Sequence, residues 1–228
     1  PITVTVPVVV AHEPQETLWL QVFQDTWALF RDHRILQLLL IEAVMHQLAS
    51  NLLNSEFHSA LRTGVEHDRE RVRLVGQFFA GVNIGAMVLQ LAVVPRFLST
   101  VTLPWFLLTI PSILICASIF FICQPSLYAV LLTFGLMKVL EYSVLTSAIE
   151  MMYMPLKAEI RNLGKELVRF GGHKLGKTLT SVAIGAAITK LGPDHELLPS
   201  SWGLFGICCW GGTLAKLANY LMKTSHHT

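Results

Sequence analysis

Apolar residues recur along the chain in long segments that have the length of membrane crossings. Crossing a bilayer takes ~20 mostly apolar residues in a helix, and six such segments follow one another. They lie at about residues 35–61, 73–95, 100–122, 126–151, 171–191 and 202–222. The first and fourth also carry many polar residues. The pattern predicts an all-α membrane protein whose domain of six transmembrane helices covers residues 33–222.

The regions outside these segments have other patterns. Residues 1–15 are rich in Pro and Val and predict an extended tether, because proline disfavours both helix interiors and central strands. Residues 16–32 predict an amphipathic helix at the membrane–water interface, although an ordinary core stripe fits equally well. The aromatic residues on its apolar face are Trp19, Phe23, Trp27 and Phe30. Residues 223–228 read as a short cytoplasmic tail.

Composition supports the membrane assignment and excludes several functions. Of 228 residues, 53% are hydrophobic and 14% are charged, against about 25% charged in soluble domains. A net charge of +2 gives no support for nucleic-acid binding, which needs many phosphate-neutralising cations. The four cysteines lie in apolar segments. No spacing marks a nucleophile with its base or a set of metal ligands, so we expect neither an enzyme nor a metal or cofactor site.

Lys and Arg gather on one side of the predicted spans. With six crossings both ends of the domain lie on the same side, and eleven Lys and Arg residues fall there against five on the other. The eleven are Arg31, Arg34, Arg96, Lys157, Arg161, Lys165, Arg169, Lys174, Lys177, Lys216 and Lys223, and the five are Arg62, Arg69, Arg71, Arg73 and Lys190. By the positive-inside rule the termini lie in the cytoplasm or its organellar equivalent.

One octapeptide matches a nucleotide-binding pattern. Residues 171–178, GGHKLGKT, fit G-x-x-x-x-G-K-[ST]. A phosphate-cradling loop of this kind joins a buried strand to a helix and works with a metal-binding Asp at the end of a second strand. Leu167 and Val168 are too few for a core strand, and no apolar run ends in an exposed Asp. We therefore expect that this match is accidental.

Polar residues inside the first and fourth spans predict an aqueous path. Ionisable groups at membrane depth are costly and tend to face a cavity or a partner. In the first span Glu42 and His46 are four residues apart, as are Asn54 and His58, so each pair meets on one helix face. A place among the lipid headgroups is the alternative for His58 and for Glu56.

The fourth span carries Lys138, Glu141 and Glu150. Lys138 and Glu141 are three residues apart and would neutralise each other. Pro155 predicts that the helix kinks or ends there. The first and fourth spans are therefore expected to face a shared cavity.

A polar connection at residues 155–170 is predicted to follow the fourth span. It lies in a basic segment that carries a family resemblance. Residues 150–156, EMMYMPL, then Arg161, Lys165 and residues 175–177, LGK, resemble the ATP/ADP translocase family of plastids and obligate intracellular bacteria. The matching pattern is E-x-x-Y-x-P-L, a basic residue, G/A-K and R/x-L-G-K-S/T, in the same order and spacing. The similarity covers about residues 30–222, the C-terminal six-helix half of that family.

The resemblance implies one half of a major-facilitator-like fold, in which two six-helix halves enclose a substrate site near the midplane. It implies exchange of nucleotides, or of a related phosphorylated solute, across a bacterial inner membrane or a plastid-type inner membrane. Arg161, Lys165 and Lys177 would engage phosphate oxygens. Tyr153 would stack on a base or stabilise the helix end, and Glu150 would pair with a cation in the empty state. An ordinary cytoplasmic loop is the alternative reading of these cations.

Two positions depart from the family pattern. Family members that exchange nucleotides tend to carry an acidic residue and a Lys around the positions of Asn54 and His58, which we count among the candidate substrate-binding residues. Their replacement implies a different substrate or lost transport. The second function to be weighed is therefore a transporter-derived structural or accessory subunit of a larger membrane assembly. The other six-helix half would lie upstream in the same gene or in another chain.

Overall fold

The computed structural model of the chain describes residues 31–191 and 201–225, and in that part every regular element is a helix. This agrees with the all-α class that the hydrophobic pattern predicts. The predicted tether at 1–15, nearly all of the predicted interfacial helix at 16–32 and the last three residues of the predicted tail lie outside the described residues.

Long helices joined by short turns follow one another along the chain. In order they are α2 (Arg34–Gly64), α3 (Asp68–Val88), the π-helical turn η1 (Leu89–Val93), α4 (Val94–Thr100), α5 (Leu103–Cys123), α6 (Leu127–Leu140), the π-helical turn η2 (Glu141–Leu145), α7 (Thr146–Tyr153), α8 (Ala158–Leu191) and α9 (Ser201–Ser225).

Local chemistry sets several of these boundaries. The Ser126 hydroxyl accepts a hydrogen bond from the N–H of Ala129 at 3.2 Å and caps α6. At the turn after α2, the Arg71 guanidinium donates to the carbonyl oxygens of Arg62 at 3.1 Å and Val65 at 2.7 Å. α7 ends two residues before Pro155, as predicted.

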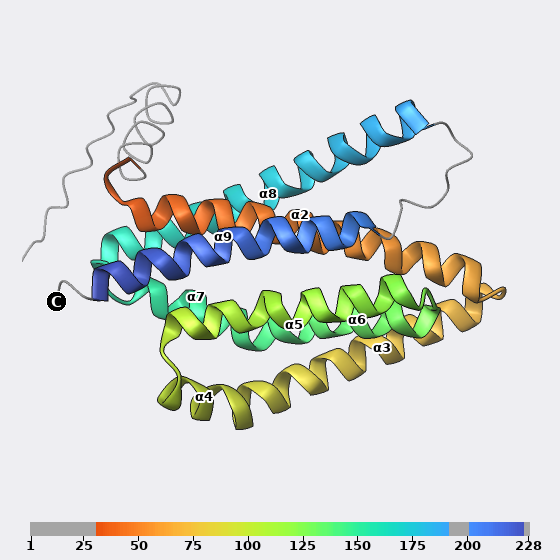
Figure 1. Cartoon of the computed structure of the whole chain (residues 1–228), viewed down its shortest axis with the longest axis horizontal. Coiled ribbons are helices and arrows are strands. Elements are labelled where there is room, and N and C mark those ends of the chain that lie inside the picture. The colour runs from red at the N-terminus through yellow and green to blue at the C-terminus, as the bar shows by residue number, and fades with distance from the viewer. Residues whose placement is uncertain (1–30, 192–200, 226–228) are drawn as a thin grey trace, which may run out of the picture.

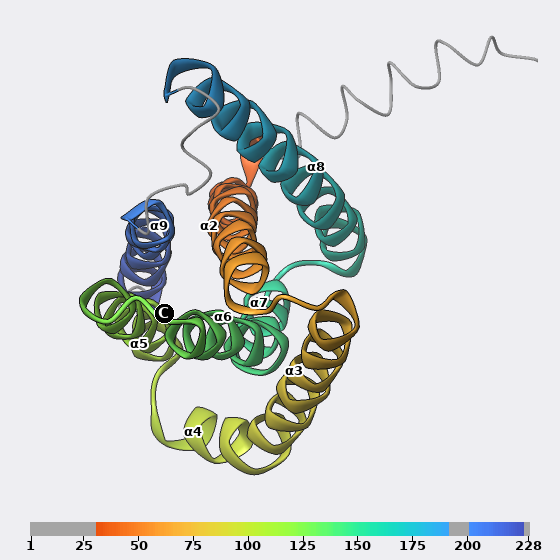
Figure 2. The ribbon, with the colours of Figure 1, turned by 90° about the vertical axis from the view of Figure 1, so that its right-hand side faces the viewer.

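α3, η1 and α4 follow one another without a break, as do α6, η2 and α7. With each of these sets counted as one helix, successive helices run in opposite directions and form an elongated bundle (Figure 1). α2 lies at its centre and packs against α8, α9 and α6, as the view along the bundle shows (Figure 2). α5 packs against α9 and α6, and α3 packs against α6. The first turn of α2 and the last turn of α9 lie at the same end of the bundle (Figure 1).

Four segments of the described chain are long and apolar enough to cross a membrane. They are Arg34–Gly64, Asp68–Phe97, Leu103–Cys123 and Leu127–Tyr153. Large apolar side chains such as Val72 (74% exposed) and Leu91 (73% exposed) cover the outer face of the second segment, as is typical of a lipid-facing surface. These features are compatible with an integral membrane protein, whereas α8 and α9 are not among the four.

The predicted polar connection at residues 155–170 is wrong. Only residues 154–157 separate α7 from α8, and the basic segment is the first half of a 34-residue helix. The hydropathy of the sequence does not reveal the first half of this helix, because charged residues interrupt the apolar run there. Arg161, Lys165 and Arg169 nevertheless recur every four residues, the spacing of neighbours on one helix face.

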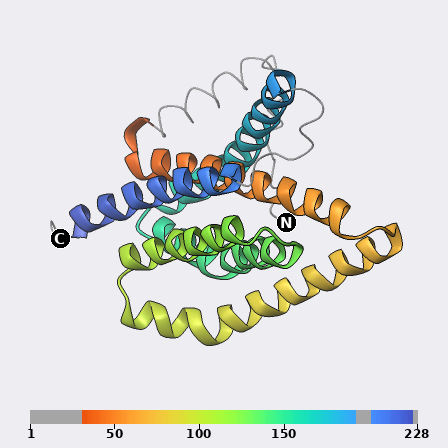
Figure 3. The same cartoon turned by 45° about the vertical axis from the view of Figure 1, so that its right-hand side comes forward.

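Glycines bring α8 very close to α2. A Cβ on Gly172 would lie 2.5 Å from the Cβ of Ala43, and one on Gly176 would lie 2.6 Å from the Cβ of Gln47. Only glycine permits this approach, as at other close helix contacts in membranes. Beyond this contact α8 leaves α2 at an angle (Figure 3), and a cavity lies between the later turns of the two helices.

Candidate functional site

Two cavities border α2, and both are closed on another side by α8. The larger, which we call the basic cavity, has a volume of about 680 Å³. It is lined by Asn51, Asn54, Ser55, His58, Ser59, Arg62, Thr63, Lys177, Thr180, Ser181 and Ile184. The smaller, the mixed-charge cavity, has a volume of about 330 Å³. It is lined by Glu42, Ala43, His46, Glu141, Leu145, Thr146, Ile149, Glu150, Tyr153, Lys165, Glu166, Val168, Arg169 and His173.

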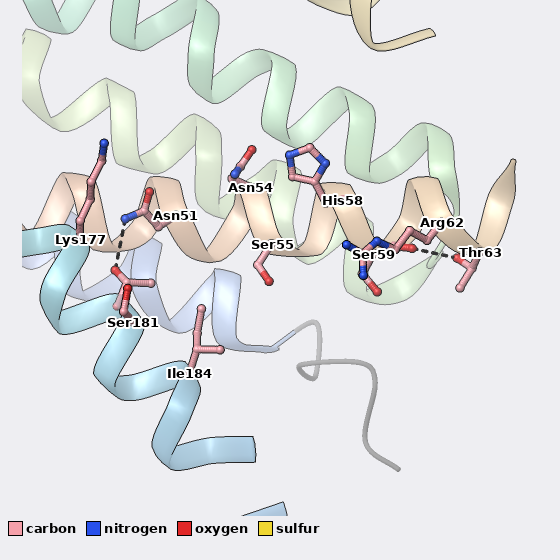
Figure 4. A pocket seen from close by; sticks show the side chains of 11 residues that line it. Asn51, Asn54, Ser55, His58, Ser59, Arg62, Thr63, Lys177, Ser181 and Ile184 are labelled. Atoms are coloured by element: carbon pink, nitrogen blue, oxygen red, sulfur yellow. Dashed lines mark hydrogen bonds between the residues drawn. The ribbon is translucent and has the colours of Figure 1, made fainter. Parts of the chain in front are cut away.

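The basic cavity combines permanent cations with neutral polar groups. Arg62 and Lys177 supply two positive charges, and no carboxylate is among the lining residues. Amide and hydroxyl groups supply most of the rest of the lining. Lys177 from α8 and Asn54 and His58 from α2 extend on the same side of α2 (Figure 4). This chemistry suits a negatively charged ligand that also needs hydrogen bonds.

Hydrogen bonds fix the base of the basic cavity. The Gln47 amide donates to Asn51 Oδ1 at 2.8 Å, and Asn51 Nδ2 donates to the Thr180 hydroxyl at 3.4 Å. Thr180 in turn donates to the carbonyl oxygen of Gly176 at 2.8 Å. This chain joins α2 to α8 where the helices begin to diverge (Figure 4), so it sets the width of the cavity.

The mixed-charge cavity holds three of the predicted binding residues together. Lys165 Nζ donates to a carboxylate oxygen of Glu150, and the same Nζ lies 5.5 Å from the centre of the Tyr153 ring. Tyr153 is buried at the end of α7. The pairing of Glu150 with a cation, predicted for the empty state, is therefore present and its partner is Lys165.

A buried ionic cluster lies on the α2 and η2 walls of the same cavity. Lys138 Nζ donates to Glu141 Oε2 at 2.7 Å and to the Ser50 hydroxyl at 2.9 Å. His46 Nε2 lies 3.7 Å from the same Glu141 oxygen. The predicted neutralisation of Glu141 by Lys138 is confirmed, and so is the predicted cavity shared by the first and fourth spans.

Two further carboxylates on α2 face α9. Glu42 Oε1 accepts a hydrogen bond from the indole N–H of Trp210 at 3.1 Å. Glu56 Oε1 accepts from the backbone N–H of Gly203 at 3.0 Å, in the first turn of α9, where helix N–H groups lack partners of their own. Glu42 and Glu56 are both buried inside the bundle, whereas His58 is exposed.

The structure thus divides the predicted site residues into two groups. Glu150, Tyr153 and Lys165 line the mixed-charge cavity, and Asn54, His58 and Lys177 line the basic cavity. Arg161 lies on the first turns of α8, half-buried and outside the lining of both.

Sequence reasoning did not include the remaining polar residues of the basic cavity. Asn51, Ser55, Ser59 and Arg62 complete a polar face of α2. Their three- and four-residue spacing was the signal that could have found them.

The GGHKLGKT octapeptide lies entirely inside α8. Its backbone N–H groups belong to the interior of a helix, and glycines 172 and 176 of this octapeptide face α2. A phosphate-cradling loop needs free N–H groups at a turn, so the rejection of a P-loop is confirmed.

No protein-family model, curated protein or solved structure matches this chain.

Proposed function

We propose that the protein transports a nucleotide, or a related phosphorylated solute, across a membrane by alternating access, and that the basic cavity receives the phosphates. The observation that carries the proposal is a cavity of about 680 Å³ with Arg62 and Lys177 among its lining residues and no carboxylate. Phosphate oxygens are matched by the planar fork of Arg and by the point charge of Lys.

The position of the cavity supports transport rather than fixed binding. Its walls are α2, which is one of the four helices able to cross a membrane, and α8, which diverges from α2 beside the cavity. A polar, cationic surface at membrane depth is costly unless a solute or ion uses it.

The mixed-charge cavity would receive the other end of the solute. Lys165 is already neutralised by Glu150, so an arriving phosphate would have to displace this carboxylate. Tyr153 lines this cavity with the Lys165 ammonium over its ring, and the ring would stack on a nucleobase once Lys165 moves away. We therefore assign Tyr153 to the base and Lys177 to the phosphates.

The resemblance to the ATP/ADP translocases supports the same fold assignment. In this proposal α8 and α9 are the fifth and sixth crossings, and a second six-helix half closes both cavities from the side opposite α2. The chain is then one half of a major-facilitator-like carrier, in a bacterial inner membrane or a plastid-type inner membrane.

The test is uptake of labelled ATP and ADP into liposomes that contain the full-length protein, with and without unlabelled nucleotide inside. We expect uptake that requires internal nucleotide. Lys177→Ala and Arg62→Ala should each raise the KM by about 10- to 100-fold, because each removes a charge-assisted hydrogen bond of roughly 1.5–3 kcal/mol.

Lys174→Ala is the matched control. It removes a Lys from the same helix, three residues before Lys177, and Lys174 lies outside the lining of both cavities, with its ammonium 5.6 Å from the Phe170 ring centre. Its KM should equal that of the wild type. Equal effects of Lys174→Ala and Lys177→Ala would show that general surface charge, not the basic cavity, attracts the nucleotide.

One observation favours the alternative, a structural or accessory subunit without transport. Lys165 has an internal partner in Glu150, as a residue that only stabilises the bundle would. Folded protein that moves no nucleotide, and whose assembly with other membrane proteins depends on the exposed apolar face of α3, would establish that alternative.

A further inference from the structure

His46 and Lys138 compete for one carboxylate oxygen. Lys138 Nζ lies 2.7 Å and His46 Nε2 lies 3.7 Å from Glu141 Oε2. His46 is 9% exposed, and its Nε2 has no hydrogen-bond partner in the part of the chain that the structure describes. An unpartnered imidazole nitrogen, buried against a carboxylate and lining a cavity, is equipped to bind a proton.

Titratable or charged groups face His46 from each helix around it. They are Glu141 from η2, Lys138 from α6, His173 from α8 and Glu42 from the preceding turn of α2. The Trp210 ring of α9 lies 5.0 Å from the His46 ring. Glu42 has only the neutral Trp210 N–H as a hydrogen-bond partner among the described residues. The cluster therefore has two carboxylates and one permanent cation, Lys138, close to His46.

We propose that His46, Glu141 and Lys138 form a proton-binding site that couples solute movement to proton movement. This inference rests on the proposed transport function and adds the identity of a coupling ion. A metal ion does not suit the cluster, because the Lys138 ammonium already occupies the carboxylate. A proton adds no volume and creates a second cation beside Glu141.

The coupling step follows from the geometry. A proton from solvent in the mixed-charge cavity adds to the unprotonated ring nitrogen of His46. The resulting imidazolium attracts Glu141 and so weakens the ion pair between Lys138 and Glu141. Lys138 also donates a hydrogen bond to Ser50, which lies one turn further along α2.

Because His46 and Ser50 lie on the same helix as Asn51, Asn54 and Arg62, a change at this contact moves the α2 wall of the basic cavity. η2, where Glu141 lies, is a π-helical turn, and such turns often mark functional sites where a helix can change shape. Proton binding at His46 is thereby connected to the phosphate site through α2, a single rigid helix that carries residues of both sites.

The test is nucleotide uptake into liposomes that contain the full-length protein and unlabelled internal ADP, with labelled ATP outside. Uptake is compared with and without an inward gradient of one pH unit, and a protonophore removes the gradient. For the wild type we expect the gradient to raise accumulation, up to about tenfold per proton. In His46→Gln the ratio of uptake with the gradient to uptake without it should fall to about one.

His67→Gln is the matched control. His67 is exposed at the start of α3 and its side chain makes no capping hydrogen bond. Nucleotide uptake by this variant should therefore equal that of the wild type, and so should its gradient ratio, which is uptake with the pH gradient divided by uptake without it. A gradient ratio that survives in His46→Gln overturns the inference. Wild-type uptake that ignores the gradient also overturns it and leaves the proposed transport intact, whereas no uptake under any condition overturns both.

If His46→Gln does not fold, a second variant tests the proton-binding site. Lys138→Met/Glu141→Gln removes both charges of the ion pair together, because removing one alone leaves a buried, unpaired charge. The inference again requires that the gradient ratio fall to about one, and an unchanged ratio overturns it. Circular dichroism and size-exclusion chromatography establish which variant is folded.

Discussion

At the scale of single residues, the unusual feature is how the buried carboxylates of α2 are paired, with Glu56 Oε2 left without a hydrogen-bond partner among the described residues. Glu42 and Glu56 each accept a hydrogen bond from a neutral N–H of α9, and neither forms an ion pair with a described residue. A buried carboxylate left without donors costs several kcal/mol or takes up a proton. The side chains and backbone of α9 therefore hold the polar stripe of α2 in place.

This arrangement predicts a specific loss of stability on removing one donor. Trp210→Phe keeps an aromatic ring but removes the N–H that Glu42 accepts, at 3.1 Å. We expect unfolding to become easier by about 1–3 kcal/mol, the cost of an unsatisfied buried polar group, seen as a lower melting temperature in detergent.

The control for this substitution is Trp105→Phe. Trp105 lies on α5 and is 62% exposed, so its replacement should leave the melting temperature almost unchanged. Equal shifts in the two variants would contradict the role given to the Trp210 N–H.

At the scale of helices, the packing of α8 on α2 depends on glycine. An added Cβ at position 172 would meet Ala43 at 2.5 Å, whereas one at Gly185, in the same helix, would have nothing within 4 Å. The same helix is thus tightly packed in its middle and open towards its end. The open end is where the basic cavity forms.

The pair Gly172→Ala and Gly185→Ala tests this difference. Gly172→Ala should destabilise the fold by about 1–3 kcal/mol, the usual cost of overpacking. Gly185→Ala should stabilise it by up to about 1 kcal/mol, because alanine favours helix. Thermal unfolding in detergent measures both, and a loss of stability in Gly185→Ala would contradict the packing described above.

Much of this architecture could be predicted from the sequence, but the limits of helices and their mutual packing could not. The shared cavity of the first and fourth spans followed from polar residues at helical spacing. The helical state of residues 158–170 was missed because hydropathy averages charged and apolar faces together. The division of the predicted site into two cavities depends on where α8 leaves α2, which long-range contacts such as Asn51 with Thr180 decide.

At the scale of the whole molecule, the order of the helices fixes which turns share an end of the bundle. The turns after α2 and α5 lie at one end of the bundle, and the turns after α4 and α7 lie at the other (Figure 1). Arg71, one of the cations counted on the less basic side, is engaged by carbonyl oxygens at the turn after α2. By the positive-inside rule, we expect the end of the bundle where the basic start of α8 lies to face the cytoplasm or its organellar equivalent.

Single cysteines test this topology. In a variant without the four native cysteines, Glu66→Cys and Gln124→Cys should react with an impermeant maleimide from one side of sealed vesicles. Thr102→Cys and Lys157→Cys should react only from the other side, which we expect to be cytoplasmic. Labelling of Glu66→Cys and Lys157→Cys from the same side would contradict a crossing bundle.

The donors that α9 supplies also bear on how the chain is made. Gly203 and Trp210 follow their carboxylate partners by 147 and 168 residues. At about 5–20 residues per second, translation separates α2 from these donors by on the order of ten seconds or more. Throughout that interval Glu42 and Glu56 lack the α9 N–H groups that later donate to them. α2 is therefore expected to remain beside water or the insertion machinery until α9 arrives, so that synthesis of α9 completes the insertion of α2.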